Sequence, residues 1–297
     1  MTSQQTILIS DLDGTYLEKS GLVPRQSRHF LSFLEANNIP FVIATSRSPH
    51  SVADLFRDIP PPLVAICSDG GVTISLSYGQ WTVSHEILLQ PMQSLSIINT
   101  FSRLIEPDEC FIFFGSSKNF AISHYSTRST ASLNILRNVL GETRPLLPMN
   151  RSLPLEHEWI EHIRAISFFD IPSRIASAIS LLESDPIPGV QVLTYPEIRF
   201  PSHHWLDITS THTTKAHAVS RLLLVDSVIP HLIALGNGDN DIALFELADI
   251  SICPEAAVTP VKELATMVVH TPCGGAFLDA VTAVLARNLP IRPEFHR

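Results

Sequence analysis

Two aspartates near the amino terminus, Asp11 and Asp13, lie in the segment Asp11-Leu-Asp-Gly-Thr15, directly after the apolar run Thr6–Ser10. In open α/β sheets, ligands bind beyond the carboxyl ends of the strands, so these two acids lie where a site is expected. Both carboxylates reach one centre only if the chain turns after the strand, which Gly14 permits. An EF-hand loop is excluded because its glycine stands at position six, whereas Gly14 stands at position four here. A solvated acidic turn is the alternative interpretation.

Two further segments could face an anion. Thr45 and Ser46 follow the apolar run Phe41–Ala44, and Ser48 precedes a helix, so hydroxyls and free N–H groups would form a neutral anion site. Ordinary capping of that helix by Ser48 is the alternative. Lys215 stands in the first turn of another expected helix, where the helix dipole disfavours a cation, so an anion should compensate it. A phosphoryl group or the aspartate pair would serve, and a solvated lysine is the alternative.

The fourth segment, Gly236-Asn-Gly-Asp-Asn-Asp241, joins an apolar run to a helical pattern. It is not the dinucleotide fingerprint G-x-G-x-x-G, because position 241 is Asp rather than Gly. Carboxylates at a strand end, without His or Cys nearby, suit a hard cation such as Mg²⁺. A turn rich in Asn, Gly and Asp is the alternative.

The elements that must position these segments alternate between strands and helices. The expected strands are Thr6–Ser10, Phe41–Ala44, Leu63–Cys67, Val72–Leu76, His231–Leu235 and Ile250–Cys253. The expected helices are Pro24–Asn37, Pro49–Arg57, Lys215–Val225, Asp241–Ala248 and Gly275–Asn288. This alternation predicts an α/β fold with a parallel sheet covered on both faces.

The middle of the chain, residues 84–205, mixes strand-like and helical runs instead of alternating them. It includes an expected helix over Ser129–Leu140 and an expected loop from Pro145 to Pro154. This composition predicts a separate α+β domain inserted into an α/β core made of residues 1–83 and 206–297.

The amino-acid composition limits the kinds of function that this protein can have. The 297 residues carry 20 Lys+Arg and 29 Asp+Glu, a net charge of −9, with no basic stripe, which argues against a nucleic-acid partner. No uncharged apolar stretch approaches the ~18 residues of a membrane span, and the amino terminus does not resemble a signal peptide. The four cysteines are scattered, as in an intracellular protein, so we expect a cytoplasmic location.

The ordered set of four segments resembles the haloacid dehalogenase (HAD) superfamily of phosphatases, in particular its Cof-type, subclass IIB branch. Asp11-x-Asp-Gly-Thr, Thr45 in Ala-Thr-x-Arg, Lys215 and the Gly236–Asp241 segment are similar to that superfamily's four motifs in order. The resemblance implies a Rossmann-like core and, at residues 84–205, a cap that selects the substrate. It also implies a phosphatase acting on a small phosphorylated metabolite, most often a sugar phosphate.

The resemblance also implies roles for individual residues. Asp11 would be the nucleophile that forms an aspartyl-phosphate, and Asp13 the general acid and base. Thr45, Ser46, Arg47 and Lys215 would surround the phosphoryl group. Mg²⁺ would be held by Asp11, the Asp13 backbone carbonyl, Asn237 and Asp241.

Asn237 departs from the family pattern, which has an aspartate at this position as the principal metal ligand. An amide oxygen can coordinate a cation but supplies no charge, so we expect weaker Mg²⁺ binding or a redistributed ligand set that could include Asp239. Two other functions stay open: a phosphomannomutase-like phosphotransferase, and a catalytically weakened protein that only binds a phosphorylated ligand. The substrate and the oligomeric state do not follow from the sequence.

Overall fold

The computed structural model divides into two compact units, Met1–His85 with Thr213–Arg297, and Glu86–His212. It describes residues 6–57, 64–77, 80–102, 111–115, 123–126, 146–148, 160–197, 200–224 and 230–288. The division therefore falls after residues 85 and 212, compared with the expected boundaries after 83 and 205. The second expected boundary lies inside strand β11 (His204–Ser210), which pairs with strands of the inserted unit.

The first unit is built on an eight-stranded sheet in the order β14-β13-β12-β1-β2-β3-β4-β5. Its strands are β1 (Thr6–Ser10), β2 (Phe41–Ala44), β3 (Val64–Cys67), β4 (Val72–Ser77), β5 (Gln80–Glu86), β12 (His231–Leu235), β13 (Ile250–Pro254) and β14 (Met267–Val269). From β14 through β3 all neighbouring strands are parallel, and β4 pairs antiparallel with β3. The predicted parallel α/β sheet is confirmed.

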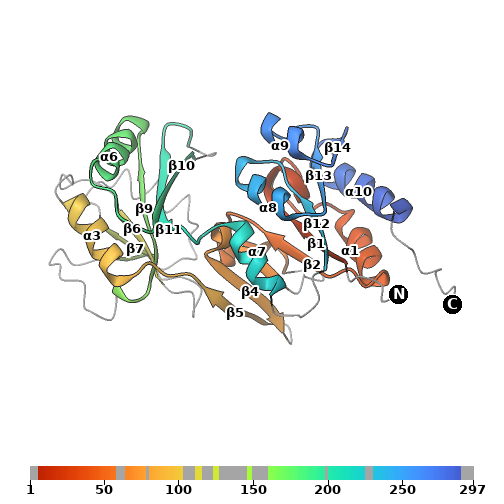
Figure 1. Ribbon diagram of the computed structural model, residues 1–297, viewed down its shortest axis with the longest axis horizontal. Helices are drawn as coiled ribbons and strands as arrows, with labels where there is room; N and C mark the ends of the chain where they lie inside the picture. The colour runs from red at the N-terminus through yellow and green to blue at the C-terminus, as the bar shows by residue number, and fades with distance from the viewer. Residues whose placement is uncertain are drawn as a thin grey trace. The chain divides into compact units, whose positions relative to one another are not determined.

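Helices cover both faces of this sheet (Figure 1). On one face α1 packs against α10, and on the other α7, α8 and α9 follow one another. The bounds of the helices are α1 (Ser27–Ala36), α2 (Pro49–Leu55), α7 (Lys215–Leu223), α8 (Ile242–Leu247), α9 (Thr259–Leu264) and α10 (Gly275–Asn288). The short helix α9 and strand β14 were not expected from the sequence.

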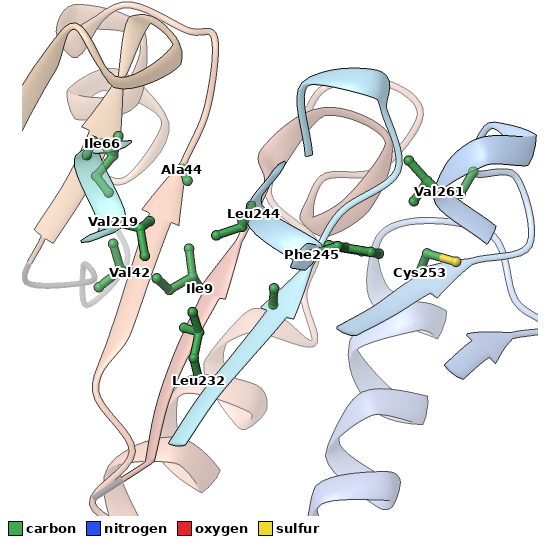
Figure 2. Close-up of a cluster of buried hydrophobic side chains, with 13 residues drawn as sticks. Ile9, Val42, Ala44, Ile66, Val219, Leu232, Leu244, Phe245, Cys253 and Val261 are labelled. Carbon is green, nitrogen blue, oxygen red and sulfur yellow. The ribbon is translucent and has the colours of Figure 1, made fainter. Parts of the chain in front are cut away.

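Apolar side chains under α7, α8 and α9 fix the strands that lead to the site. Figure 2 shows Ile9 of β1 and Leu232 of β12 beside Val219 of α7 and Leu244 of α8. Ile9 and its neighbour Leu8 are both fully buried, on opposite faces of the sheet, as expected for a central parallel strand. Each such side chain stabilises the fold by roughly 1.5–3 kcal/mol, so β1 is anchored two residues before Asp11.

The inserted unit contains a six-stranded sheet in the order β10-β11-β9-β6-β7-β8. The strands are β6 (Phe111–Gly115), β7 (Ser123–Ser126), β8 (Leu146–Pro148), β9 (Ile163–Asp170), β10 (Val190–Pro196) and β11. Helices α3 (Pro91–Ser102) and α6 (Pro172–Ser184) pack on one face through a cluster that includes Ile97, Ile175 and Leu206. The expected loop Pro145–Pro154 is wrong at β8, which pairs with β7, and the expected helix Ser129–Leu140 lies outside the described residues.

Among the described residues, no helix is both long and apolar enough to cross a bilayer.

Candidate active site

Lys215 lies fully buried between two carboxylates that come from different loops. Its Nζ donates to Asp11 Oδ1 at 2.6 Å and to Asp241 Oδ1 at 2.7 Å. The three side chains are 0%, 8% and 0% exposed, so the charges interact with little screening by water. The anions that compensate Lys215 at the start of α7 are thus Asp11 and Asp241. With both carboxyl groups ionised, one cation between two anions gives the cluster one net negative charge.

Burial and charge act in opposite directions on this cluster. Burial raises the pKa of Asp11 to about 7, and nearby Asp241 and Asp13 add to that, while Lys215 lowers it. Burial alone lowers the pKa of Lys215, but Asp11 and Asp241 raise it above its ordinary value. The ammonium group therefore stays charged at neutral pH and favours the ionised form of Asp11.

The loop after β1 passes very close to the loop after β12. Asp11 N–H donates to the carbonyl of Leu235 at 2.9 Å, which continues the parallel pairing of β1 and β12. Gly14 has a φ of +78°, and a Cβ at this position would come within 2.4 Å of Asn237 Nδ2. Only glycine fits both the left-handed backbone and this close approach.

Tyr16 holds the end of the same loop. Its ring is fully buried and lies 5.6 Å from the ring of Phe41 and 6.2 Å from that of Phe30, between centroids. These aromatic contacts fix the loop that carries both aspartates against β2 and α1.

Both carboxylate oxygens of Asp241 accept hydrogen bonds from protein groups. Its Oδ1 accepts from Lys215, and its Oδ2 accepts from the backbone N–H groups of Asn237 at 2.9 Å and Gly238 at 3.1 Å. These contacts orient Lys215 and the loop after β12, and the expected role of Asp241 as a metal ligand stays a prediction. Asp239, the extra acid, lies exposed at the start of the same turn.

The side chain of Asn237 contacts the loop after β1, and its amide can be placed in two orientations. In one, Oδ1 accepts from Thr15 Oγ1 at 2.8 Å. In the other, the amide nitrogen donates to Asp11 Oδ2 at 3.2 Å, to the Asp13 carbonyl at 2.8 Å and to Thr15 Oγ1 at 2.8 Å. Asp11 Oδ2, the Asp13 carbonyl and the Asn237 amide therefore converge on one small region. Each of these three groups has an oxygen that could hold a hard cation.

The loop after β2 contributes Thr45, Ser46 and Arg47. Thr45 is buried, its Oγ1 accepts from the Arg47 N–H at 3.1 Å, and Ser46 is exposed. Ser48 caps α2 by accepting from the Ser51 N–H, as the capping alternative predicted.

Arg47 lies beside Asp13 and forms an ion pair with it. Its Nε donates to Asp13 Oδ2 and its Nη2 to Asp13 Oδ1, both at 2.6 Å. The substrate role expected of Arg47 did not include this pairing. The guanidinium group fixes the plane of the Asp13 carboxylate at the partly exposed side of the site.

Two functional candidates were missed in the sequence, Asp69 and Asn240. Asn240 Nδ2 donates to Asp69 Oδ1 at 2.8 Å, and the Asp69 N–H donates to the carbonyl of Thr45 at 3.0 Å. Asp69 and Ser68 have φ values of +52° and +50°, a strained backbone of the kind found at functional sites. The signal was available: Ser68-Asp-Gly-Gly71 follows the third parallel strand at the same edge of the sheet.

The sequence is similar to those of known hydrolases. A sequence profile described as haloacid dehalogenase-like hydrolase matches residues 8–280. The chain is 24% identical over 246 residues to "Putative phosphatase MG265" of Mycoplasma genitalium, covering 80% of this chain and 83% of that protein.

Two solved structures share the fold over nearly the whole chain. TM0651 from Thermotoga maritima superposes with a TM-score of 0.74 at 18% identity, covering 95% of this chain and 97% of that one. The "HAD Subclass IIB Sugar Phosphatase BT4131" gives a TM-score of 0.66 at 14% identity, covering 95% and 98%. Because the family profile spans most of the chain, the resemblance seen in the four motifs is confirmed, and this protein belongs to the family of haloacid dehalogenase-like hydrolases.

Proposed function

We propose that this hydrolase is a phosphatase that cleaves monoesters of small phosphorylated metabolites, with sugar phosphates as the first class to test. The observation that carries the proposal is the Asp11 carboxylate, buried and held by Lys215 Nζ at 2.6 Å. A buried carboxylate oriented by a fixed cation is suited to attack a phosphorus atom and to share the cation with the incoming phosphoryl oxygens.

The proposed reaction has two displacements. A carboxylate oxygen of Asp11 forms a bond to phosphorus while the bond from phosphorus to the ester oxygen breaks, and Asp13 gives its proton to the departing alkoxide. Asp13 then takes a proton from water, whose oxygen displaces Asp11 from phosphorus and releases inorganic phosphate. Asp13 suits this exchange because its side chain is 45% exposed, beside the buried nucleophile, so it can meet both leaving group and water.

Asp11 Oδ2, the Asp13 carbonyl and the Asn237 side chain are the groups that would hold Mg²⁺. Their convergence at 2.8–3.2 Å around the Asn237 amide is compatible with three oxygen ligands of one small cation. A bound Mg²⁺ would neutralise charge on the phosphoryl group. Thr45, at the neighbouring strand end, would donate a hydroxyl hydrogen bond to the phosphoryl oxygens.

We assign substrate selection to the inserted unit, residues 86–212, as the cap of the proposed phosphatase. The support is the family membership and the fold shared with a structure whose title names a subclass IIB sugar phosphatase. The cytoplasmic location expected from the sequence stays a prediction.

Phosphate release from an aryl phosphate and from a panel of sugar phosphates, with and without Mg²⁺, tests the proposal. We expect activity in the native protein and its loss in Asp11→Asn, with Asp54→Asn on the exposed face of α2 as the matched control. Activity that survives Asp11→Asn would contradict the assigned nucleophile. Transfer of the phosphoryl group to a second site on the sugar, in place of free phosphate, would favour the phosphomutase alternative.

A further inference from the structure

The Asn237 side chain faces three oxygens of the loop after β1, all of which can accept hydrogen bonds. One end of the amide lies 3.2 Å from Asp11 Oδ2, 2.8 Å from the Asp13 carbonyl and 2.8 Å from Thr15 Oγ1. With oxygen at that end, only the Thr15 hydroxyl can donate to it, and two oxygens of the aspartate loop face a third oxygen. With nitrogen at that end, two N–H groups point at those acceptors.

These orientations suit two different states of the site. Without a cation, acceptors left without donors in a half-buried place are unfavourable, so the nitrogen should face Asp11 and Asp13. With a cation among the same oxygens, the nitrogen would have to turn away and the oxygen take its place. The amide packs closely against the backbone of Gly14, where a Cβ would come within 2.4 Å of Asn237 Nδ2.

We infer that Asn237 is an internal substitute for the divalent cation. Its amide nitrogen bonds Asp11 Oδ2 and the Asp13 carbonyl when the site holds no cation, and the amide rotates to present Oδ1 when one binds. The inference rests on the proposed function for the identity of the cation only. The Asn237 amide makes cation binding weak and reversible. Each binding event must break the amide hydrogen bonds, and residue 237 adds no negative charge to hold the cation.

An aspartate at position 237 would behave in the opposite way. Its carboxylate would place a second negative charge beside Asp11, with no N–H to satisfy the acceptors, so the metal-free protein should be less stable. The added charge should also tighten cation binding.

Thermal unfolding and calorimetric Mg²⁺ titration, without any substrate, test this inference on the full chain. In EDTA, Asn237→Asp should unfold at least about 2 °C below the native protein, and saturating Mg²⁺ should raise its midpoint more than it raises the native one. The variant should bind Mg²⁺ at least about ten-fold more tightly than the native protein. Asn38→Asp, an exposed position on the loop before β2, makes the same change of charge and should alter neither quantity.

The native protein gives a second readout, in which the variant serves only to identify a resonance. The ¹⁵N side-chain resonance of Asn237, identified by its absence in Asn237→Asp, should shift on Mg²⁺ titration, and its amide hydrogens should exchange faster with water. An Asn237 resonance that is unchanged while Mg²⁺ binds would overturn the inference, as would a variant that matches the native midpoint in EDTA. A protein that passes both tests yet hydrolyses no phosphate ester would refute the proposed function alone.

Discussion

Arg47 and Asp13 form a two-point ion pair, with Nε to Oδ2 and Nη2 to Oδ1 both at 2.6 Å. The two residues come from the loops after β2 and β1, so the pair links two strand ends at the rim of the site. Asp13 is the proposed general acid and base, and Arg47 orients the carboxylate form that takes a proton from water. Arg47 is therefore a positioning residue in the proposed mechanism.

Replacing Arg47 should lower catalysis more than stability. Arg47→Met should reduce kcat by about 10- to 100-fold because Asp13 loses its fixed orientation. The free energy of unfolding should change by at most about 1 kcal/mol, since the pair is partly exposed. Arg47→Lys should recover only part of the rate, because an ammonium group cannot make the two-point contact. Kinetics on an aryl phosphate and urea unfolding give both quantities.

Arg57→Met is the matched control for this prediction. Arg57 pairs with Asp54 on α2, where both side chains are mostly exposed. Its removal should change neither kcat nor stability beyond about 0.5 kcal/mol. Equal kinetic losses in both variants would show that Arg47 has no specific role.

Removal of Lys215 should destabilise the protein strongly. Lys215→Met leaves Asp11 and Asp241 as buried neighbouring carboxylates without their cation, a change that costs about 3–5 kcal/mol. The double variant Lys215→Met with Asp241→Asn should recover part of that loss, because one of the two uncompensated charges is gone. Urea unfolding measures both, with Lys262→Met near the protein surface as the control. A single variant as stable as the native protein would contradict the ion-pair network.

The sequence predicted the central sheet because its signals are local. Strands β1, β2 and β12 have the expected bounds, since each is a short apolar run enclosed by turn residues. Strand β11 was missed because Asp207 and Thr209 interrupt its apolar residues, and the expected boundary was placed inside it. Those polar residues are on the face opposite Leu206 and Ile208, which pack in the apolar cluster of the inserted unit.

The sequence predicted which residues gather at the site, but not which of them form hydrogen bonds with one another. The placement of Asp11, Thr45 and Asn237 at one edge follows from parallel strands that end together, whereas Lys215 comes from the first turn of α7, after the inserted unit. The partners did not follow, because hydrogen bonds between loops depend on backbone turns that sequence patterns do not encode. The Arg47–Asp13 and Asn240–Asp69 pairs are of this kind, since each joins two loops far apart in the chain.

The stability difference between Asp11→Asn and the native protein should depend on pH. Burial raises the pKa of Asp11 from 3.8 to about 7, so between these values the folded protein binds a proton that the unfolded chain has lost. The ionisation of Asp11 therefore lowers the stability of the native protein as pH rises through this window, whereas the neutral variant is unaffected. Urea unfolding from pH 4.5 to 7.5 should show the variant gaining stability relative to the native protein. A gap that moves in the other direction would mean that Lys215 outweighs burial at Asp11.

Gly14 should tolerate substitution less well than Gly21, although both have left-handed backbones with φ values of +78° and +77°. A Cβ on Gly14 meets Asn237 Nδ2 at 2.4 Å, whereas a Cβ on Gly21 meets only the end of Arg47, at 3.4 Å. Gly21→Ala should lose about 1–2 kcal/mol of stability from backbone strain alone. Gly14→Ala carries the same strain and also displaces Asn237, so its loss of stability should be larger and its phosphatase activity should fall further. Urea unfolding and phosphate release on both variants measure the difference. Equal losses would mean that the contact between Gly14, in the loop after β1, and Asn237, in the loop after β12, does not stabilise the site.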